Sequence, residues 1–357
     1  MKYKILLSGG GTMGSVSPLI AVYQEIKKRQ SEAEFLFVGT ANGPERSAVE
    51  SYKIPFLAVT SGKFRRYFSW QNFIDPFKII WGFLQSLKIL LAFRPQLVMV
   101  AGAYVGVPLA WAAGLLRIPI LIHQQDIEVG LANRLMSPVA RKITVSFDIS
   151  LRDFKRGRAT LTGNPIREEF SHCDKEKSRE LFGLKKDVPI VFFTGGGTGA
   201  ATVNKILDQA LPDLMKFIQV IHVTGKGKKI NFSADNYRQF EFITHEMPEA
   251  LCVADLVVTR AGLSTLSELS YCGKPSIIIP MYRTHQEDNA NYFQKHNAAV
   301  VLSEVSLNKK MLADVISELI KSDDKLDKLS KNIRKMMPQN GAGAVADIIL
   351  QLIKKKK

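Results

Sequence analysis

Short, uninterrupted apolar runs alternate along the chain with segments whose apolar residues recur every three or four positions. Residues 5–7 form the first run, and residues 35–38, 97–100, 118–122 and 143–147 continue the series. Runs of this kind are typical of buried parallel strands, whereas the spacing between them is typical of amphipathic helices. The pattern therefore predicts a doubly wound α/β sheet in the first half of the chain.

The same pattern begins again at residue 188, after a polar and charged segment over residues 169–187. Apolar runs follow at residues 188–193, 220–224, 254–258 and 275–280, and amphipathic helices are predicted at 312–320 and 344–353. A polar segment between two such series suits an exposed connection. We therefore expect two α/β halves, with room for a ligand between them.

A glycine-rich turn follows the first predicted strand, at Gly9, Gly10, Gly11 and Gly14, and leads into a predicted helix at 18–26. Glycines allow backbone N–H groups to approach an anion closely, and a helix N-terminus attracts negative charge. The spacing Gly-x-Gly-x-x-Gly also fits a dinucleotide fingerprint, which needs an acidic residue after the second strand. That strand ends in Gly39-Thr40 without a carboxylate. A phosphorylated ligand is therefore expected, and NAD is disfavoured.

Composition and cysteine content narrow the class of protein. The 357 residues are 46% hydrophobic and 23% charged, as in globular proteins of two domains. The three cysteines are odd in number and lack CxxC spacing, which favours reduced cysteines and argues against structural zinc. No secretory signal is visible, and the uncharged stretch Leu97–Leu116 is better interpreted as strand, loop and helix start than as a membrane span.

The net charge of +16 calls for an anionic partner. No nucleic-acid-binding signature accompanies it, so we expect no nucleic acid. Basic residues gather instead among aromatic ones between Lys63 and Lys88, a stretch that includes Trp70, Phe77 and Trp81. Such a stretch can lie in a membrane interface, with its rings at the level of the headgroups and its cations on anionic lipid. The alternative is a core helix with an ordinary solvated face.

Seven ordered motifs resemble those of the bacterial MurG family of peptidoglycan glycosyltransferases, and they cover nearly the whole chain. The motifs are Gly10–Pro18, Gly102–Pro108, His123–Asp126 with Gly130–Asn133, Gly163–Arg167, Gly195–Ala200, Arg260–Glu268 and His285–Ala290. The resemblance implies transfer of GlcNAc from UDP-GlcNAc to lipid I, an undecaprenyl-linked acceptor, at the cytoplasmic face of the membrane. The protein would be peripheral there.

The resemblance also implies a GT-B fold with two Rossmann-like domains that face each other across a cleft. Residues 1–166 would bind the acceptor and meet the membrane, residues 167–337 would bind the UDP-sugar, and residues 338–357 would form a helix returning to the first domain.

The resemblance assigns the donor site to the second domain. By this assignment Ile243 meets the uracil, Glu268 the ribose hydroxyls, and Gly196 and Gly197 the diphosphate, with Arg260 able to stabilise the leaving group. Further substrate contacts are expected from Thr198, Leu263, Ser264, Thr265, Leu266, Ser267, Gln286 and Asn289. From the residues themselves, Ser264 or Thr265 can cap the helix that follows Gly262.

In the first domain the resemblance places Thr12, Met13, Gly14, Asp126, Asn133 and Arg167 at the substrate. The chain departs from the family at four positions, because the family usually has Gly, His, Glu and Asn where this chain has Met13, Ser15, Gln124 and Asp126. Neither serine nor glutamine can act as a general base at neutral pH. The catalytic candidates are therefore Asp126, then His123, with Ser15 at the position of the family's histidine. For His123 the alternative is a structural histidine at a strand end.

No Asp-x-Asp pair occurs to hold a divalent ion, so we expect metal-independent transfer with inversion and no cofactor. Backbone N–H donors and a helix N-terminus would stabilise the departing UDP. Three alternatives remain open at this point. The chain could act on another lipid acceptor, it could be a UDP-GlcNAc epimerase, or it could bind UDP-sugar without catalysis.

Overall fold

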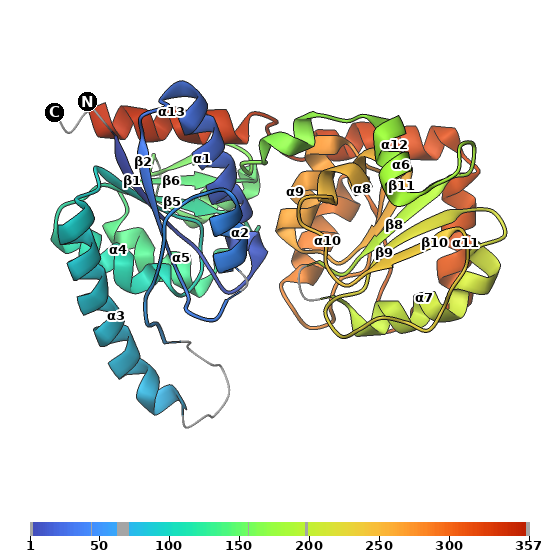
Figure 1. Ribbon diagram of the computed structural model, residues 1–357, viewed down its shortest axis with the longest axis horizontal. Helices are drawn as coiled ribbons and strands as arrows, with labels where there is room; N and C mark the ends of the chain where they lie inside the picture. Colours follow the sequence, from blue (N-terminus) through green and yellow to red (C-terminus); the bar gives the residue numbers. More distant parts are fainter. Residues whose placement is uncertain (1–2, 44, 63–70, 156, 197–198, 355–357) are drawn as a thin grey trace. The chain divides into compact units, whose positions relative to one another are not determined.

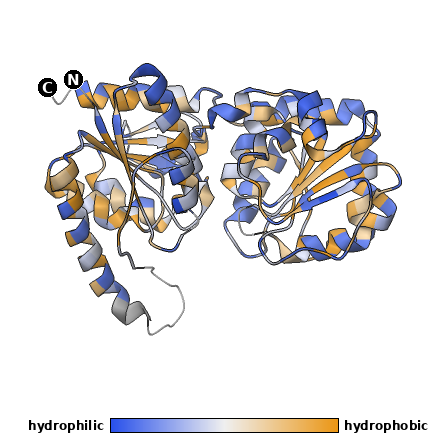
Figure 2. Ribbon diagram, viewed as in Figure 1, coloured by the Kyte–Doolittle hydropathy of each residue, from blue (hydrophilic) through white to orange (hydrophobic). Residues whose placement is uncertain are grey.

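The structure, a computed structural model, describes residues 3–43, 45–62, 71–155, 157–196 and 199–354. The chain divides into two compact units. Unit 1 comprises Met1–Glu168 together with Met337–Lys357, and unit 2 comprises Glu169–Met336. Each unit holds one sheet flanked by helices, and the central strands of both sheets are largely hydrophobic (Figures 1 and 2).

Unit 1 contains a parallel sheet in the order β3-β2-β1-β4-β5-β6-β7. The strands are β1 (Lys4–Ser8), β2 (Glu34–Gly39), β3 (Phe56–Ala58), β4 (Leu97–Val100), β5 (Ile120–Gln124), β6 (Lys142–Val145) and β7 (Ala159–Leu161). The predicted apolar runs are buried on both faces, as in a sheet covered by helices on both sides. The expected doubly wound α/β architecture is confirmed for this half.

The helices of unit 1 cover both faces of the sheet (Figure 1). They are α1 (Ser17–Arg29), α2 (Glu45–Ser51), α3 (Gln71–Phe93), α4 (Gly106–Leu115), α5 (Leu131–Met136) and α13 (Gly341–Lys354). Helix α13 packs against α1, and Val345, Ile349 and Ile353 join the core formed around Ile5 and Leu7. Residues from the end of the chain thus complete the core of the first unit.

Unit 2 repeats the strand order with β10-β9-β8-β11-β12-β13, again all parallel. Its strands are β8 (Ile190–Thr194), β9 (Gln219–Val223), β10 (Tyr237–Phe240), β11 (Leu256–Thr259), β12 (Ser276–Ile278) and β13 (Val300–Val301). Its helices are α6 (Lys175–Phe182), α7 (Ala201–Leu214), α8 (Met247–Val253), α9 (Leu263–Cys272), α10 (Gln286–Lys295), α11 (Lys309–Ile320) and α12 (Asp323–Arg334). Two Rossmann-like halves are therefore confirmed.

The start of α9 differs from the prediction. The N-cap residue is Gly262, and no side chain caps the helix, so the expectation that Ser264 or Thr265 acts as the cap is wrong. Both residues lie inside the first turn. Glycine tolerates the extended N-cap backbone at little cost, and the absence of a capping side chain leaves the first N–H groups of α9 to other acceptors.

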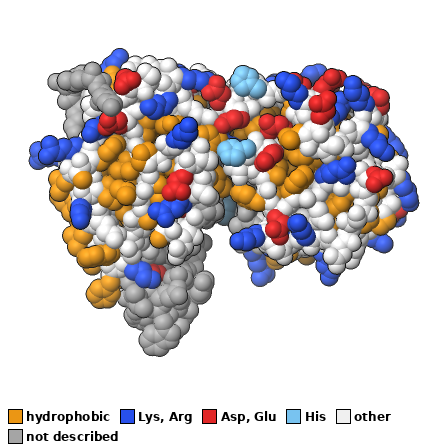
Figure 3. Space-filling view, in the orientation of Figure 1, with side chains coloured by type: hydrophobic (Ala, Val, Ile, Leu, Met, Phe, Trp, Pro, Cys, Tyr) orange, Lys and Arg blue, Asp and Glu red, His pale blue; other side chains and the backbone are white. Residues whose placement is uncertain are grey.

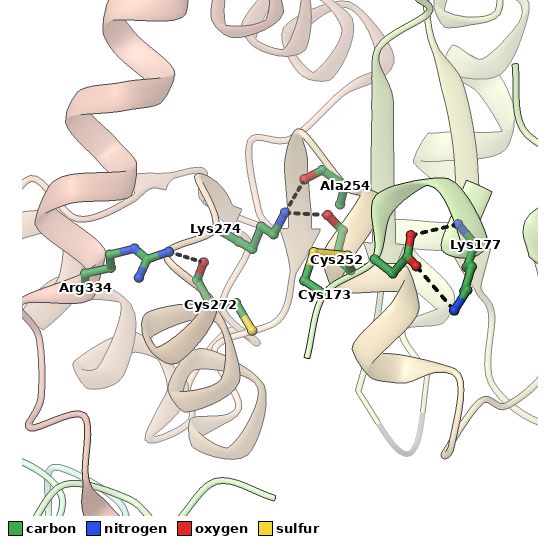
Figure 4. Close-up of a disulfide and its surroundings, with 8 residues drawn as sticks. Cys173, Lys177, Cys252, Ala254, Cys272, Lys274 and Arg334 are labelled. Carbon is green, nitrogen blue, oxygen red and sulfur yellow. Dashed lines mark hydrogen bonds and ion pairs between the residues drawn. A yellow bond between two sulfur atoms is a disulfide. The ribbon is translucent and has the colours of Figure 1, made fainter. Parts of the chain in front are cut away.

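Two of the three cysteines form a disulfide within unit 2 (Figure 4). Cys173 precedes α6, Cys252 lies in α8, and their Cα atoms are 5.3 Å apart. This pairing corrects the expectation of reduced cysteines, since an odd number excludes only complete pairing. Cys272 remains a thiol, and burial raises its pKa to about 12. Half-buried and protonated, Cys272 is a packing residue.

Helix α3 carries apolar residues on the face turned away from the rest of unit 1. Its packed face holds Gly82, Ser86 and Leu90 against the rest of the unit, including α4. The opposite face exposes Phe77, Ile80, Trp81, Leu84 and Leu91. Within the described residues, Asp75–Phe93 is the one helix long and apolar enough to cross a membrane by length and composition, with 17% of that window buried.

Candidate functional site

Both units present glycine-rich loops where the direction of strand connection changes. In unit 1 this point lies between β1 and β4, and in unit 2 it lies between β8 and β11. Ligands of open α/β sheets bind outside the carboxyl ends of the strands at such a point. The predicted motifs 10–18 and 102–108 flank the first point, and 195–200 and 260–268 flank the second.

Residues 9–16, called loop 1 here, are folded back by Ser15. The N–H of Gly10 donates to Ser15 Oγ at 2.9 Å, and that hydroxyl lies within 3.3 Å of the carbonyl oxygens of Gly10 and Thr12. Ser15 is buried, whereas Thr12 is exposed and Met13 and Gly14 are half-buried. Ser15 therefore holds the loop, and Thr12, Met13 and Gly14 form its accessible tip.

His123 is buried completely near the end of β5. Its Nε2 donates to Asn164 Oδ1 at 2.9 Å, and its Nδ1 accepts from the hydroxyl of Thr144 at 2.9 Å. Burial lowers the pKa of His123 to about 4, although the hydrogen bond to Asn164 acts in the opposite direction. Both ring nitrogens serve the fold, which favours the interpretation of His123 as a structural histidine.

The low pKa of His123 predicts a loss of stability in mild acid. The unfolded chain binds a proton near pH 6.5 and the folded chain only near pH 4, so the contribution is present above 6.5 and is lost as pH falls toward 4. We expect this histidine to cost about 2 kcal/mol of unfolding free energy between pH 7 and pH 5. Urea unfolding at both pH values should show less acid sensitivity in His123→Gln than in the wild type. Exposed His172→Gln is the control, and equal sensitivity in all three proteins would contradict the prediction.

Gln124, where the family usually has glutamate, is buried and holds the loop that carries Asp126. Its Nε2 donates to the carbonyl oxygens of Asp126 at 2.7 Å and Glu128 at 2.9 Å, and its Oε1 accepts from Asn133 at 2.5 Å. Only an amide can donate to two carbonyls and accept a third bond here. Asn133, predicted as a substrate contact, is likewise buried and positions Gln124.

Asp126 itself is half-buried at the carboxyl end of β5. The preceding residue, Gln125, donates to the carbonyl oxygen of Ala101 at 3.3 Å, which ties this loop to the loop after β4. Tyr104 of that second loop lies close to Gly11 of loop 1. Loop 1 and the loops after β4 and β5 are therefore neighbours, with Asp126 among them.

Arg167, which is also predicted as a substrate contact, is buried within unit 1. Its Nη1 donates to the hydroxyl of Tyr52 at 3.1 Å. Arg167 belongs to unit 1 by its contacts, because the division between the units follows Glu168.

In unit 2 the loop after β8 begins with glycines, of which Gly196 has a left-handed backbone. Gly196 has a φ of 71° and donates its N–H to Thr194 Oγ1 at 3.1 Å, and no atom lies within 4 Å of a Cβ built there. Gly199 also has a positive φ and packs against the carbonyl of Thr224. Helix α7 follows without a side-chain cap. Gly197 and Thr198 lie outside the described residues.

Arg260 is held by hydrogen bonds and an ion pair within unit 2. Its guanidinium donates to the carbonyl oxygens of Ile279 at 3.1 Å and Pro280 at 3.3 Å and forms an ion pair with Glu304. Burial alone would raise the pKa of the Glu304 carboxyl, but hydrogen bonds from Arg260 and from the N–H of Tyr282 hold that pKa below its usual value. Arg260 is buried, and its ion pair with Glu304 joins the loop after β11 to the segment after β13.

The remaining residues that are predicted to bind the UDP-sugar fall into two groups. Leu266 and Ser267 of α9 are fully buried, and Asn289 donates to the carbonyl of Ala261 at 3.0 Å, so these three belong to the framework. Gln286 accepts from the N–H of Met281 at 3.1 Å. The residues nearer the surface of this region are Ile243, Leu263, Ser264, Thr265 and Glu268, of which Ser264 is the most accessible.

Two carboxylates at these loop clusters, buried Glu45 and half-buried Glu304, are not among the residues predicted from the sequence. Glu304 follows β13 and pairs with Arg260, while Glu45 begins α2 and accepts hydrogen bonds from loop 1. Neither belongs to a motif that the resemblance covers. For Glu45 the available signal is its position shortly after the predicted strand at 35–38, whereas no strand is predicted before Glu304.

Comparison with family models decides the family. The glycosyltransferase family 28 N-terminal domain matches residues 5–145, and the family 28 C-terminal domain matches residues 190–345. The chain belongs to glycosyltransferase family 28, in its MurG branch. The two family 28 domains correspond to the two sheets.

Full-length relatives carry a single activity in their names. The chain is 34% identical to the UDP-N-acetylglucosamine–N-acetylmuramyl-(pentapeptide) pyrophosphoryl-undecaprenol N-acetylglucosamine transferase of Clostridium tetani, over 98% of both chains. It is 36% identical to the enzyme of the same name from Clostridium perfringens, again over 98% of both chains.

Solved structures agree on the fold. MurG of Acinetobacter baumannii superimposes with a TM-score of 0.72 at 23% identity and covers 98% of this chain and 100% of its own. UDP-GlcNAc 2-epimerase of Neisseria meningitidis, bound to UDP-GlcNAc, has a TM-score of 0.71 at 13% identity over 98% and 100% of the two chains. At these identities the likeness establishes a shared fold of two Rossmann-like domains, the GT-B type, for this family 28 protein.

Proposed function

We propose that this family 28 protein transfers GlcNAc from UDP-GlcNAc to the 4-hydroxyl of MurNAc in lipid I and so forms lipid II for peptidoglycan synthesis. The observation that carries the proposal is the full-length identity of 34–36% to transferases named for this reaction. The glycine-rich loops after β1 and β8, and the motifs after β4 and β11, lie at the carboxyl ends of the strands. Ligands of open α/β sheets bind there.

The donor sits on unit 2 in this proposal. The N–H groups around Gly196 and the uncapped N-terminus of α7 receive the diphosphate, and the carboxylate of Glu268 accepts from the ribose hydroxyls. Uncapped helix N–H groups stabilise the negative charge that develops on departing UDP. The backbone beside Ile243 meets the uracil. Because Arg260 is paired with Glu304, backbone donors take the main part in holding UDP.

Asp126 is the general base of this proposal. Ser15, Gln124 and His123 form hydrogen bonds that hold the fold, and Asp126 is a half-buried carboxylate on the loop after β5, in the same group of loops as loop 1. Its carboxylate accepts the proton of the MurNAc hydroxyl as that oxygen attacks the anomeric carbon and the bond to UDP breaks. Direct displacement inverts the configuration, and this chain's own donors stabilise the leaving group.

The test is transfer from labelled UDP-GlcNAc to purified lipid I. Product carrying the label, with UDP released in equal amount, would support the proposal. Labelled UDP-GlcNAc offered with diacylglycerol instead tests the alternative of another lipid acceptor, which Met13 and Ser15 in loop 1 favour. Absence of label in lipid I would overturn the main proposal, and incorporation into the other lipid would replace it.

We propose further that unit 1 docks on the anionic cytoplasmic face of the cell membrane through α3 and its neighbours. Apolar residues exposed on α3 continue onto α4 and α5, which pack against it in turn; the exposed residues there are Trp111, Leu115, Leu131 and Leu135. Figure 3 draws hydrophobic side chains over the part of unit 1 where Figure 1 places α3 and α4. Exposed Lys88, Arg94, Arg117 and Arg134 lie on the same elements or next to them. The basic residues Lys63, Arg65 and Arg66 and the aromatic Trp70, which belong to the same prediction, lie outside the described residues.

Vesicle binding should therefore depend on both apolar contact and charge. Sedimentation with vesicles containing anionic phospholipid should fall about tenfold or more in Phe77→Ser/Trp81→Ser, because each change removes a large exposed aromatic ring from the interface. Raising salt to about 0.5 M should weaken wild-type binding as well. Exposed Leu181→Ser in unit 2 is the control. Binding that ignores both salt and these substitutions would contradict docking through α3.

A further inference from the structure

Glu45 is an ionisable residue with no exposed surface at the edge of loop 1. It is the first residue of α2, shortly after β2. Its Oε1 accepts from the backbone N–H of Thr40 at 2.8 Å and from the hydroxyl of the same residue, and its Oε2 accepts from the N–H of Gly11 at 3.2 Å. One carboxylate therefore joins the end of β2, the start of α2 and the glycine loop.

The surrounding backbone is shaped around this carboxylate. A Cβ added at Gly10 would lie 2.5 Å from Glu45 Oε1, and one added at Gly43 would lie 1.8 Å from Oε2. A side chain at either position would displace the carboxylate of Glu45. The contacts are those of a built anion site whose anion is supplied by the chain itself.

Because of this arrangement, the Gly-x-Gly-x-x-Gly turn of unit 1 differs from the same turn in dinucleotide-binding domains. In dinucleotide-binding domains the N–H groups of this turn receive a pyrophosphate. Here the N–H of Gly11 donates to Glu45 and the N–H of Gly10 donates to Ser15. A phosphate approaching these groups would meet a buried negative charge and two occupied donors.

We propose that Glu45 is a positioning residue that fills the anion site of loop 1 from within, so that unit 1 excludes the nucleotide and presents Thr12–Gly14 to an acceptor hydroxyl. This inference rests on the proposed transferase function. It accounts for why two units with the same strand order and similar glycine loops take different ligands, since the N–H of Gly11 in loop 1 donates to the carboxylate of Glu45, whereas the N–H of Gly196 in unit 2 donates to the neutral hydroxyl of Thr194.

The site requires a carboxylate. Each oxygen of Glu45 faces a backbone N–H, so the amide of glutamine would place its own NH₂ group against one of them. The buried donor left without an acceptor would then loosen the loop. Aspartate is one methylene shorter and cannot reach both donors from the same backbone position.

The experiment combines kinetics with chemical rescue. In Glu45→Ala and Glu45→Gln we expect the KM for lipid I to rise about tenfold or more, because the loop loses its internal acceptor, with the KM for UDP-GlcNAc within about twofold of the wild-type value. Formate added to Glu45→Ala should restore acceptor binding, since it can occupy the vacated anion site. Formate should not rescue Glu45→Gln, whose side chain still fills the space.

Hydrogen exchange of the peptides that contain Gly11 and Thr40 gives a readout independent of turnover. Exchange should accelerate in Glu45→Ala and slow again with formate, while exposed Glu50→Gln on the same helix behaves as wild type in both assays. Unchanged exchange in Glu45→Ala, or a UDP-GlcNAc KM that rises as much as that for lipid I, would overturn the role of Glu45. If the wild type transfers nothing to lipid I, the proposed function fails, and exchange with formate still decides the place of Glu45.

Discussion

Asp126→Asn is expected to lower kcat about 10²- to 10⁴-fold, the range that a positioned general base contributes. Asparagine keeps the size and polarity of aspartate but cannot accept the proton of the attacking hydroxyl at neutral pH. Because Asp126 acts on the acceptor in this proposal, the affinity for UDP should not change. The measurement is steady-state transfer to lipid I over a range of pH, in parallel with UDP titration.

The matched control is Glu128→Gln, which removes an exposed carboxylate from the same loop. Its turnover should equal that of the wild type. In Asp126→Asn the acidic limb of the rate–pH profile should also disappear, a change that a merely structural defect would not produce. A residual rate within about threefold of the wild type would rule out Asp126 as the base and return the question to other groups near loop 1.

The fold could be predicted from sequence because the strands are short apolar runs separated by helical spacing. Strands such as β1, β4 and β5 are buried on both faces and leave no ambiguity of period. The start of α9 was mispredicted since Ser264 and Thr265 suit a cap by composition, while the backbone turns at Gly262. The residue at which a helix begins depends on the backbone geometry of the loop before it.

The site was predictable at the level of loops and less so at the level of side chains. Glycine motifs mark the carboxyl ends of the strands, and they lie where expected. The role of a polar side chain depends on its partners: Arg260 had no visible partner in sequence until β13 brought Glu304 beside it. Glu45 escaped notice for the same reason, because its donors lie on loop 1 and at the end of β2.

The partners of His123 and Gln124 also explain why the departures from the family pattern are hard to interpret from sequence. A glutamine in place of the usual glutamate suggests the loss of a base. In the structure Gln124 uses both of its amide hydrogens on the loop of Asp126, so the substitution changes what supports that loop. Gln124 therefore supports the loop of Asp126 in this family 28 protein.

Glu268→Ala is expected to weaken UDP binding about tenfold to a hundredfold, the cost of removing a charged acceptor from the ribose hydroxyls. Glu268 is largely buried in α9, so Glu268→Gln serves as a second variant that keeps the packing, and thermal unfolding shows which variant folds. Exposed Asp288→Asn on α10 is the control for loss of charge.

A 2′-deoxy analogue of UDP makes the prediction specific to the ribose. The wild type should bind 2′-deoxy-UDP more weakly than UDP, and Glu268→Ala should bind the two alike, since the partner of the hydroxyl has been removed. The titrations then give the coupling free energy between the Glu268→Ala substitution and the removal of the 2′-hydroxyl. If both proteins lose the same affinity with the analogue, Glu268 does not contact the 2′-hydroxyl. The uridine would then have to be placed elsewhere on unit 2, or on unit 1, where the carboxylate of Glu45 opposes an anionic ligand.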